Sequence, residues 1–237
     1  MTDAVRIGLV LPDVMGTYGD GGNAVVLRQR LLLRGIAAEI IEITLGDPVP
    51  ESLDLYTLGG AEDYAQRLAT THLRRHRGLQ RAADRGAPVL AICAAIQVLG
   101  HWYETAAGER VDGVGLLDLT TSPQSERTIG EVVSTPSVAG LTESLTGFEN
   151  HRGGTVLGPD ARPLATVIKG AGNRKGDGVD GAVQGSVLAT YLHGPCLARN
   201  PELADLLLTR ITGPLPPLEL PEVDQLRRER LAAPRRM

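Results

Sequence analysis

The chain has 237 residues, of which 42% are hydrophobic and 3% aromatic, and its formal net charge is −4. This size suits one large α/β domain with an aliphatic core, and the acidic balance argues against a general nucleic-acid surface. Two cysteines exclude a disulfide scaffold, no apolar run reaches the roughly 20 residues of a membrane span, and no signal-peptide pattern opens the sequence, so we expect a cytoplasmic protein.

The first half of the sequence alternates short apolar runs with longer amphipathic stretches. The runs predict strands at 5–11, 38–43, 53–58 and 87–92, and the stretches predict helices at 24–34, 65–85 and 94–99. Strands that alternate with helices form a mostly parallel sheet whose two faces the helices cover. In such a sheet the functional residues lie at the carboxyl ends of the strands.

The second half of the sequence has a different pattern. It indicates strands and loops over 111–137, a glycine-rich loop over 170–181, a strand over 186–192 and a helix over 203–209. From residue 213 the chain is proline-rich and then charged, which is typical of a tail with one short helix. We therefore predict one domain over 1–212 and a C-terminal tail over 213–237.

Cys93 stands between a buried strand and a helix, a position suited to a nucleophile. The first turn of the helix offers free backbone N–H groups and a partial positive charge, which favour the reactive thiolate over the thiol. The same N–H groups can stabilise an oxyanion. A lone cysteine after an apolar strand is more often a small buried hydrophobic residue, so position alone does not decide its role.

Four further features fit a catalytic site around Cys93. His193 ends another apolar strand, and Gly59 and Gly60 end a third, where glycine lets backbone N–H groups approach a ligand. Gln97 is a polar residue on the helix after Cys93. Arg127 is a cation suited to binding a substrate carboxylate. Together these residues form a Cys–His pair with oxyanion donors and a carboxylate clamp.

These motifs resemble those of the class I glutamine amidotransferases. The resemblance rests on Gly59-Gly60, on ICAAIQVLG around Cys93 and on TYLHGP around His193. Three longer segments, DVMGTYGDGGN (13–23), GFENHRGGT (147–155) and TYLHGPCLARNPELAD (190–205), are similar to GatD, the glutaminase subunit of the enzyme that amidates lipid II in Gram-positive bacteria. The amidotransferase domain of cobyric acid synthase is a near relative. The resemblance runs from about residue 5 to about residue 210.

The resemblance implies a flavodoxin-like three-layer α/β/α fold and a role for each motif. Cys93 would attack the side-chain amide of L-glutamine to form a thioester, with His193 as its base. The N–H groups of Gly60 and Ala94 would stabilise the oxyanion. Arg127, Gly59 and Gln97 would bind the substrate, and no metal is implied.

Two departures from the family pattern stand out. The usual nucleophile turn is G-x-C-x-G, whereas here alanines occupy both glycine positions, as Ala91 and Ala95. The usual carboxylate two residues after the histidine is replaced by Pro195. In the GatD branch an aspartate of the partner ligase subunit, MurT, completes the triad. We expect the same here, which implies a heterodimer and weak glutaminase activity of the isolated chain.

The resemblance also implies where the ammonia goes. A MurT-like ligase subunit would use ATP and Mg²⁺ to activate the α-carboxyl of D-glutamate in lipid II, and this chain itself would carry no cofactor. One alternative is an amidotransferase that serves a cobyric-acid-like substrate. A second is a non-catalytic binding or regulatory module that kept the fold, which the alanines and Pro195 favour. A third is a stand-alone cysteine hydrolase that acts on another amide.

Overall fold

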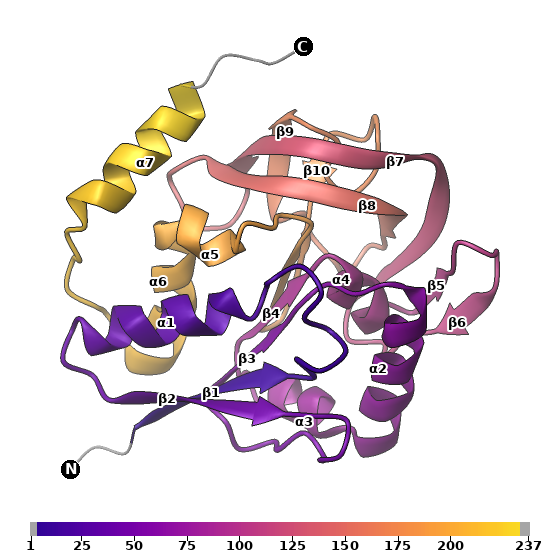
Figure 1. Ribbon diagram of the computed structural model, residues 1–237, viewed down its shortest axis with the longest axis horizontal. Helices are drawn as coiled ribbons and strands as arrows, with labels where there is room; N and C mark the ends of the chain where they lie inside the picture. The colour runs from indigo at the N-terminus through magenta and orange to yellow at the C-terminus, as the bar shows by residue number, and fades with distance from the viewer. Residues whose placement is uncertain (1–3, 233–237) are drawn as a thin grey trace.

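The computed structural model describes residues 4–232 and contains two β-sheets (Figure 1). The first sheet has the order β11-β12-β4-β3-β1-β2. Its strands are β1 (Val5–Val10), β2 (Ala38–Ile43), β3 (Leu55–Leu58), β4 (Val89–Ile92), β11 (Ala182–Gln184) and β12 (Val187–Thr190). All neighbouring pairs are parallel except β11 with β12 at one edge. The strands predicted from the buried apolar runs are therefore confirmed.

Helices cover both faces of this sheet, which gives the predicted α/β/α arrangement (Figure 1). They are α1 (Gly22–Leu32), α2 (Asp63–His76), α3 (Gly78–Asp84), α4 (Ala94–Leu99), α5 (Cys196–Arg199) and α6 (Pro201–Thr212). α1 packs with α5 and α6, and α2 packs with α4. The single helix predicted over 65–85 is broken at Arg77, which adopts a left-handed conformation with φ 50°. Gly78 follows because a Cβ there would lie 1.7 Å from the carbonyl oxygen of Val49.

The second sheet is built from the middle of the chain and has the order β10-β9-β7-β5-β6, with β8 paired to β7. Its strands are β5 (Trp102–Glu104), β6 (Arg110–Asp112), β7 (Leu119–Pro136), β8 (Leu145–Leu157), β9 (Ala165–Lys169) and β10 (Val179–Asp180). Backbone hydrogen bonds join it to the first sheet. The N–H of Phe148 on β8 donates to the carbonyl of His193 at 3.1 Å, and the N–H of His193 donates back at 2.9 Å.

The register of the first sheet aligns the carboxyl ends of its central strands. Thr190 on β12 lies beside Ile92 on β4, and Leu58 on β3 lies opposite Ala91. The residues that follow these strands, among them Cys93, therefore come together at one edge of the sheet. The core beneath them is aliphatic with three fully buried tyrosines, Tyr56, Tyr103 and Tyr191.

The segment after α6 continues into α7 (Pro221–Ala232), which has no buried residues. Its Arg227 side chain donates hydrogen bonds to the backbone carbonyls of Ser144 and Arg199. The division into a domain and a tail at residue 213 stays a prediction. Within residues 4–232, no helix is both long enough and apolar enough to cross a membrane.

Candidate active site

Cys93 occupies a strained turn between β4 and α4. Its φ of 54° and ψ of −110° lie outside the regions that ordinary residues adopt, at a cost of about 1–3 kcal/mol. Its N–H donates to the carbonyl of Thr190 at 2.9 Å, which ties the turn to β12. Ala91 and Ala95 are fully buried, and neither has a positive φ. The strain therefore falls on the cysteine, and the turn accommodates both alanines.

The environment of the Cys93 thiol favours its protonated form. Burial, reinforced by the negative charge of Asp20, raises the pKa of the thiol to about 12. A hydrogen bond from the Ala94 N–H acts in the opposite direction but is outweighed. The start of the helix thus favours the thiolate, as expected, but burial outweighs this effect. Reaction at Cys93 requires a base to remove the proton.

His193 lies at the same sheet edge and is held by a carboxylate of this chain. Its Nδ1 lies 3.0 Å and 3.1 Å from the two carboxylate oxygens of Asp20, whose side chain is fully buried. Its Nε2 is buried and has no hydrogen-bond partner among the described residues. Pro195 is indeed no carboxylate, but the loop after β1 supplies one. A carboxylate of this chain therefore faces His193, whereas the supply of a triad carboxylate by a partner subunit stays a prediction.

The two glycines after β3 have different surroundings from those the sequence suggested. The Gly60 N–H donates to Asp20 Oδ2 at 2.9 Å, so in this structure it points at a carboxylate. Gly59 makes room for the loop after β1, because a Cβ there would lie 2.3 Å from the carbonyl oxygen of Met15. Neither glycine lines the cavity beside Cys93, whereas Ala94 does.

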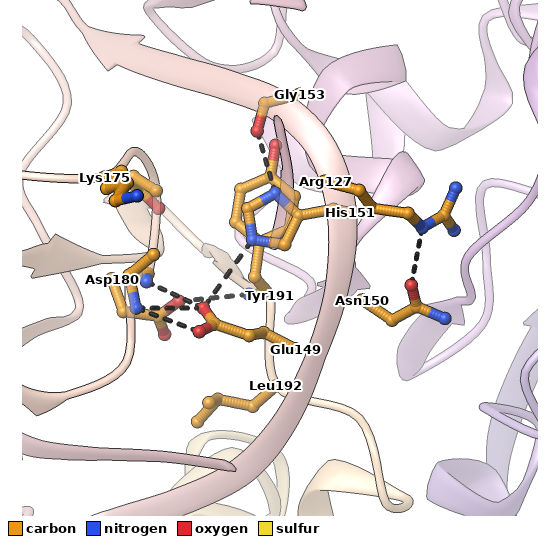
Figure 2. Close-up of polar contacts among 12 residues, drawn as sticks. Arg127, Glu149, Asn150, His151, Gly153, Lys175, Asp180, Tyr191 and Leu192 are labelled. Atoms are coloured by element: carbon orange, nitrogen blue, oxygen red, sulfur yellow. Dashed lines mark hydrogen bonds and ion pairs between the residues drawn. The ribbon is translucent and has the colours of Figure 1, made fainter. Parts of the chain in front are cut away.

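A cavity of about 400 Å³ opens beside Cys93. Arg127, Gln97 and Ala94 line it, together with Tyr18, Glu62, Asn150 and His151. Arg127 Nε donates to Asn150 Oδ1 at 2.7 Å, as Figure 2 shows. The other end of the guanidinium lies 3.3 Å from the Tyr18 hydroxyl and 3.8 Å from the Glu62 carboxylate. A cation and a thiol thus face the same cavity.

Gln97 connects this cavity to a group of buried polar side chains that includes Tyr191 and His151. Its Nε2 donates to the Tyr191 hydroxyl at 3.2 Å, and its Oε1 accepts a hydrogen bond from Gln66 at 2.8 Å. The Tyr191 ring stacks on His151 at 3.9 Å, and His151 Nε2 lies 3.7 Å from the Glu149 carboxylate (Figure 2). The side-chain amide of Gln97 is therefore fixed, and it contributes a rigid wall to the cavity.

Asp180 is a fully buried carboxylate that holds the end of β12. It accepts hydrogen bonds from the Thr190 hydroxyl and from the Tyr191 N–H. Burial raises its pKa from the ordinary 3.8 to about 6. Within residues 4–232, no cluster of three or more histidine, cysteine or carboxylate side chains is arranged to hold a metal ion.

The raised pKa of Asp180 predicts a pH dependence of stability. Between the two pKa values the folded protein binds more protons than the unfolded chain, so stability falls as the pH rises from about 4 to about 6. We expect this carboxyl to lower the free energy of unfolding by on the order of 2–3 kcal/mol across that range. Urea denaturation at a series of pH values measures it. Asp180→Asn should flatten the profile, and an identical slope in the variant would contradict the assignment.

Comparison with known proteins places this geometry in a family. Residues 6–201 match the model of the CobB/CobQ-like glutamine amidotransferase domain. The chain is a glutamine amidotransferase of this family. The lipid II isoglutaminyl synthase subunit GatD of Staphylococcus aureus is 36% identical over 202 residues, which cover 84% of this chain and 81% of that protein. GatD of Streptococcus pneumoniae is 32% identical, covering 86% and 79%.

Other relatives of this amidotransferase are more distant. Cobyric acid synthase of Sphingopyxis alaskensis is 33% identical over 73% of this chain, but the match spans 35% of the length of that protein. Among solved structures, PurLQS of Thermotoga maritima has a TM-score of 0.60 at 16% identity, covering 88% of this chain and 98% of that chain. A solved glutamine amidotransferase has a TM-score of 0.56 at 20% identity, covering 86% of this chain and 98% of that chain. These structures share the class I amidotransferase fold.

Proposed function

We propose that this amidotransferase is the glutaminase subunit of a two-subunit ligase that amidates the α-carboxyl of D-glutamate in lipid II. The site geometry carries the glutaminase part, because a strained cysteine and a carboxylate-held histidine lie at one sheet edge beside a cavity that contains Arg127. The ligase part is supported by the similarity to GatD, which spans 81% of the S. aureus protein. The match to cobyric acid synthase spans 35% of that protein.

Hydrolysis proceeds in two halves at Cys93. His193 Nε2 takes the thiol proton while the sulfur attacks the side-chain amide carbon of L-glutamine. Collapse of the tetrahedral intermediate breaks the C–N bond, and His193 protonates the leaving nitrogen to give ammonia. Water then attacks the γ-glutamyl thioester with His193 as base, and the C–S bond breaks to release glutamate and restore the thiol. The Ala94 N–H, at the start of α4, is one donor to the oxyanion.

Arg127 binds the α-carboxylate of glutamine in this proposal. Its guanidinium is half exposed at the cavity wall and faces only neutral oxygens and the 3.8 Å contact with Glu62, so a bidentate carboxylate can replace these partners. The partner ligase subunit binds ATP and Mg²⁺, activates the acceptor carboxylate and receives the ammonia. This division of labour places the whole complex where lipid II is made, on the cytoplasmic side.

Replacing Arg127 with alanine should raise the KM for glutamine about 10- to 100-fold, because a hydrogen-bonded charge contributes roughly 1.5–3 kcal/mol to binding. The kcat should change much less, since the reacting atoms stay in place. Steady-state glutamate release measures both constants. Arg152→Ala is the matched control, because Arg152 also lines the cavity but its Nε donates to the Gln124 carbonyl. Equal effects of the two substitutions would contradict a specific role for Arg127.

The proposed function is tested by purification of the tagged chain from its own cells, followed by identification of the co-purifying ligase. The complex should transfer ¹⁵N from amide-labelled glutamine to lipid II in the presence of ATP. The isolated chain should release glutamate more slowly than the complex. Transfer to a corrinoid carboxylate instead of lipid II would select the cobyric-acid-type alternative. No labelling of Cys93 by a glutamine-analogue electrophile, even in the complex, would select the non-catalytic module.

A further inference from the structure

Asp20 touches two different parts of the catalytic machinery at once. It is 2% exposed and lies on the loop between β1 and α1. One side of its carboxylate faces His193 Nδ1 at 3.0 Å and 3.1 Å, and Oδ2 also accepts the Gly60 N–H at 2.9 Å. A buried carboxylate is stabilised by such donors, and in return it fixes the groups that supply them.

The contact with His193 determines which ring nitrogen is available for chemistry. A carboxylate only accepts hydrogen bonds, so Nδ1 carries the proton and Nε2 keeps its lone pair. Nε2 is buried and has no hydrogen-bond partner among the described residues, so its lone pair is unoccupied. Asp20 therefore orients His193 from within the chain.

The contact with Gly60 has the opposite effect on catalysis. A backbone N–H makes one strong hydrogen bond, and this one is directed at Asp20 Oδ2. While that bond persists, Gly60 cannot donate to an oxyanion that forms at the substrate carbon. Only one oxygen of the carboxylate contacts Gly60 but both lie within reach of Nδ1, so a small rotation of Asp20 can release Gly60 and still hold His193.

Tyr18 links this arrangement to the cavity in which we place the substrate. It lies two residues before Asp20 on the same loop, and its ring centroid is 5.0 Å from that of His193. Its hydroxyl donates to the Glu62 carboxylate and accepts a hydrogen bond from Arg127 at 3.3 Å. A carboxylate that binds Arg127 would compete with Glu62 and Tyr18. Substrate binding at Arg127 would therefore change the contacts of the loop that carries Asp20.

We propose that Asp20 is the positioning residue of this site, which orients His193 from within the chain and holds the Gly60 N–H until a glutamine carboxylate binds at Arg127. The proposal rests on the function proposed above, and it adds that substrate binding controls when the Gly60 N–H becomes available. Until that binding, one oxyanion donor, the Gly60 N–H, is occupied by Asp20. Loss of one such donor costs on the order of 10²–10³-fold in kcat.

Asp20→Asn tests the positioning role in the co-purified complex. The amide keeps the shape of the carboxylate but cannot accept hydrogen bonds on both of its polar atoms, so His193 loses its fixed tautomer. We expect kcat for glutamine to fall by about 10²-fold or more with KM changed less than about threefold. Asp13→Asn is the control, because Asp13 lies on the same loop but accepts a hydrogen bond from the Leu45 N–H. A kcat within about threefold of wild type in Asp20→Asn would overturn the proposal.

The hydrogen bond from the Gly60 N–H to Asp20 can be observed directly in the wild-type full chain, without any variant. Glycine labelled with ¹³C at the carbonyl and ¹⁵N at the amide gives coupled signals only from Gly–Gly pairs, which occur here at 21–22, 59–60 and 153–154. We expect the Gly60 amide to exchange slowly with solvent in the free chain and to shift when a glutamine-analogue electrophile reacts with Cys93. The Gly22 and Gly154 amides serve as internal references. A Gly60 amide that is unprotected in the free chain, or unchanged after labelling, would contradict the proposal that Asp20 occupies this N–H until substrate binds.

The two experiments separate this inference from the proposed function. A wild-type complex that does not hydrolyse glutamine contradicts the function, whereas the Gly60 signal still reports the contact with Asp20. An active wild-type complex with an equally active Asp20→Asn variant contradicts the positioning role and leaves the function intact. Circular dichroism shows whether the variant is folded.

Discussion

Replacing Cys93 with alanine should abolish glutamine hydrolysis, with a loss in kcat of at least about 10⁴-fold, because no other group can form the thioester. The complex should still amidate its acceptor when ammonium chloride replaces glutamine, since the ligase subunit performs that step. Glutamate release and amidated product are measured on the same preparation. Alanine keeps the Cβ and therefore the strain of a φ of 54°, and it loses the buried sulfur, so the folded state should be modestly less stable than wild type.

Cys196→Ala is the matched control for Cys93. Cys196 is also fully buried, and its sulfur lies 3.7 Å from the Asn200 amide, away from the cavity. We expect this variant to keep glutamine hydrolysis and to show only a modest loss of stability. If Cys93→Ala lost the ammonia-dependent reaction as well, Cys93 would be needed for folding or assembly, and its assignment as nucleophile would lose its support.

His193→Asn should lower kcat by about 10²–10⁴-fold, the range that a positioned general base contributes. The effect should be large here because the pKa of the Cys93 thiol is about 12, so little thiolate exists without a base. Asparagine retains a donor toward Asp20, which limits the change to proton transfer. Single-turnover measurement of thioester formation separates this step from product release.

The control for His193 is His101→Asn. His101 is half exposed, and its Nε2 lies 2.9 Å from Asp118 on the surface. This variant should hydrolyse glutamine at the wild-type rate. Thioester formation at an unchanged rate in His193→Asn would show that another group takes the thiol proton, and the structure would then have to supply a different base.

The first sheet was predictable from the sequence because its strands are short runs of buried apolar residues. β3 and β4 are buried at every position, and such an environment favours runs that are mostly apolar. The second sheet was not predictable to the same degree. β7 is long and mostly polar, with an irregular register between Pro123 and Thr128, so its sequence lacks a regular alternation. The break at Arg77 was missed because arginine favours helix locally, whereas tertiary packing against Val49 imposes the turn.

The candidate site was partly predictable for a related reason. Cys93 and His193 each end a strand, so the topology of a parallel sheet is enough to bring them to one edge. Asp20 is separated from His193 by 173 residues and lies on a loop, where sequence patterns say little about side-chain direction. The family pattern has its carboxylate two residues after the histidine, where this chain has Pro195. The fold instead supplies the carboxylate from a different strand end.

The hydrogen bonds between the backbones of Phe148 and His193 set a limit on what side-chain substitution can reveal about this enzyme. These two hydrogen bonds join His193 to β8 through main-chain atoms, and alanine scanning leaves main-chain atoms untouched. Alanine at position 148 would therefore leave both hydrogen bonds in place, although they anchor His193. Proline at position 148, or an ester in place of the amide, removes the donor itself. Side-chain substitution alone therefore cannot detect this contact of His193, and a change to the backbone amide itself is needed.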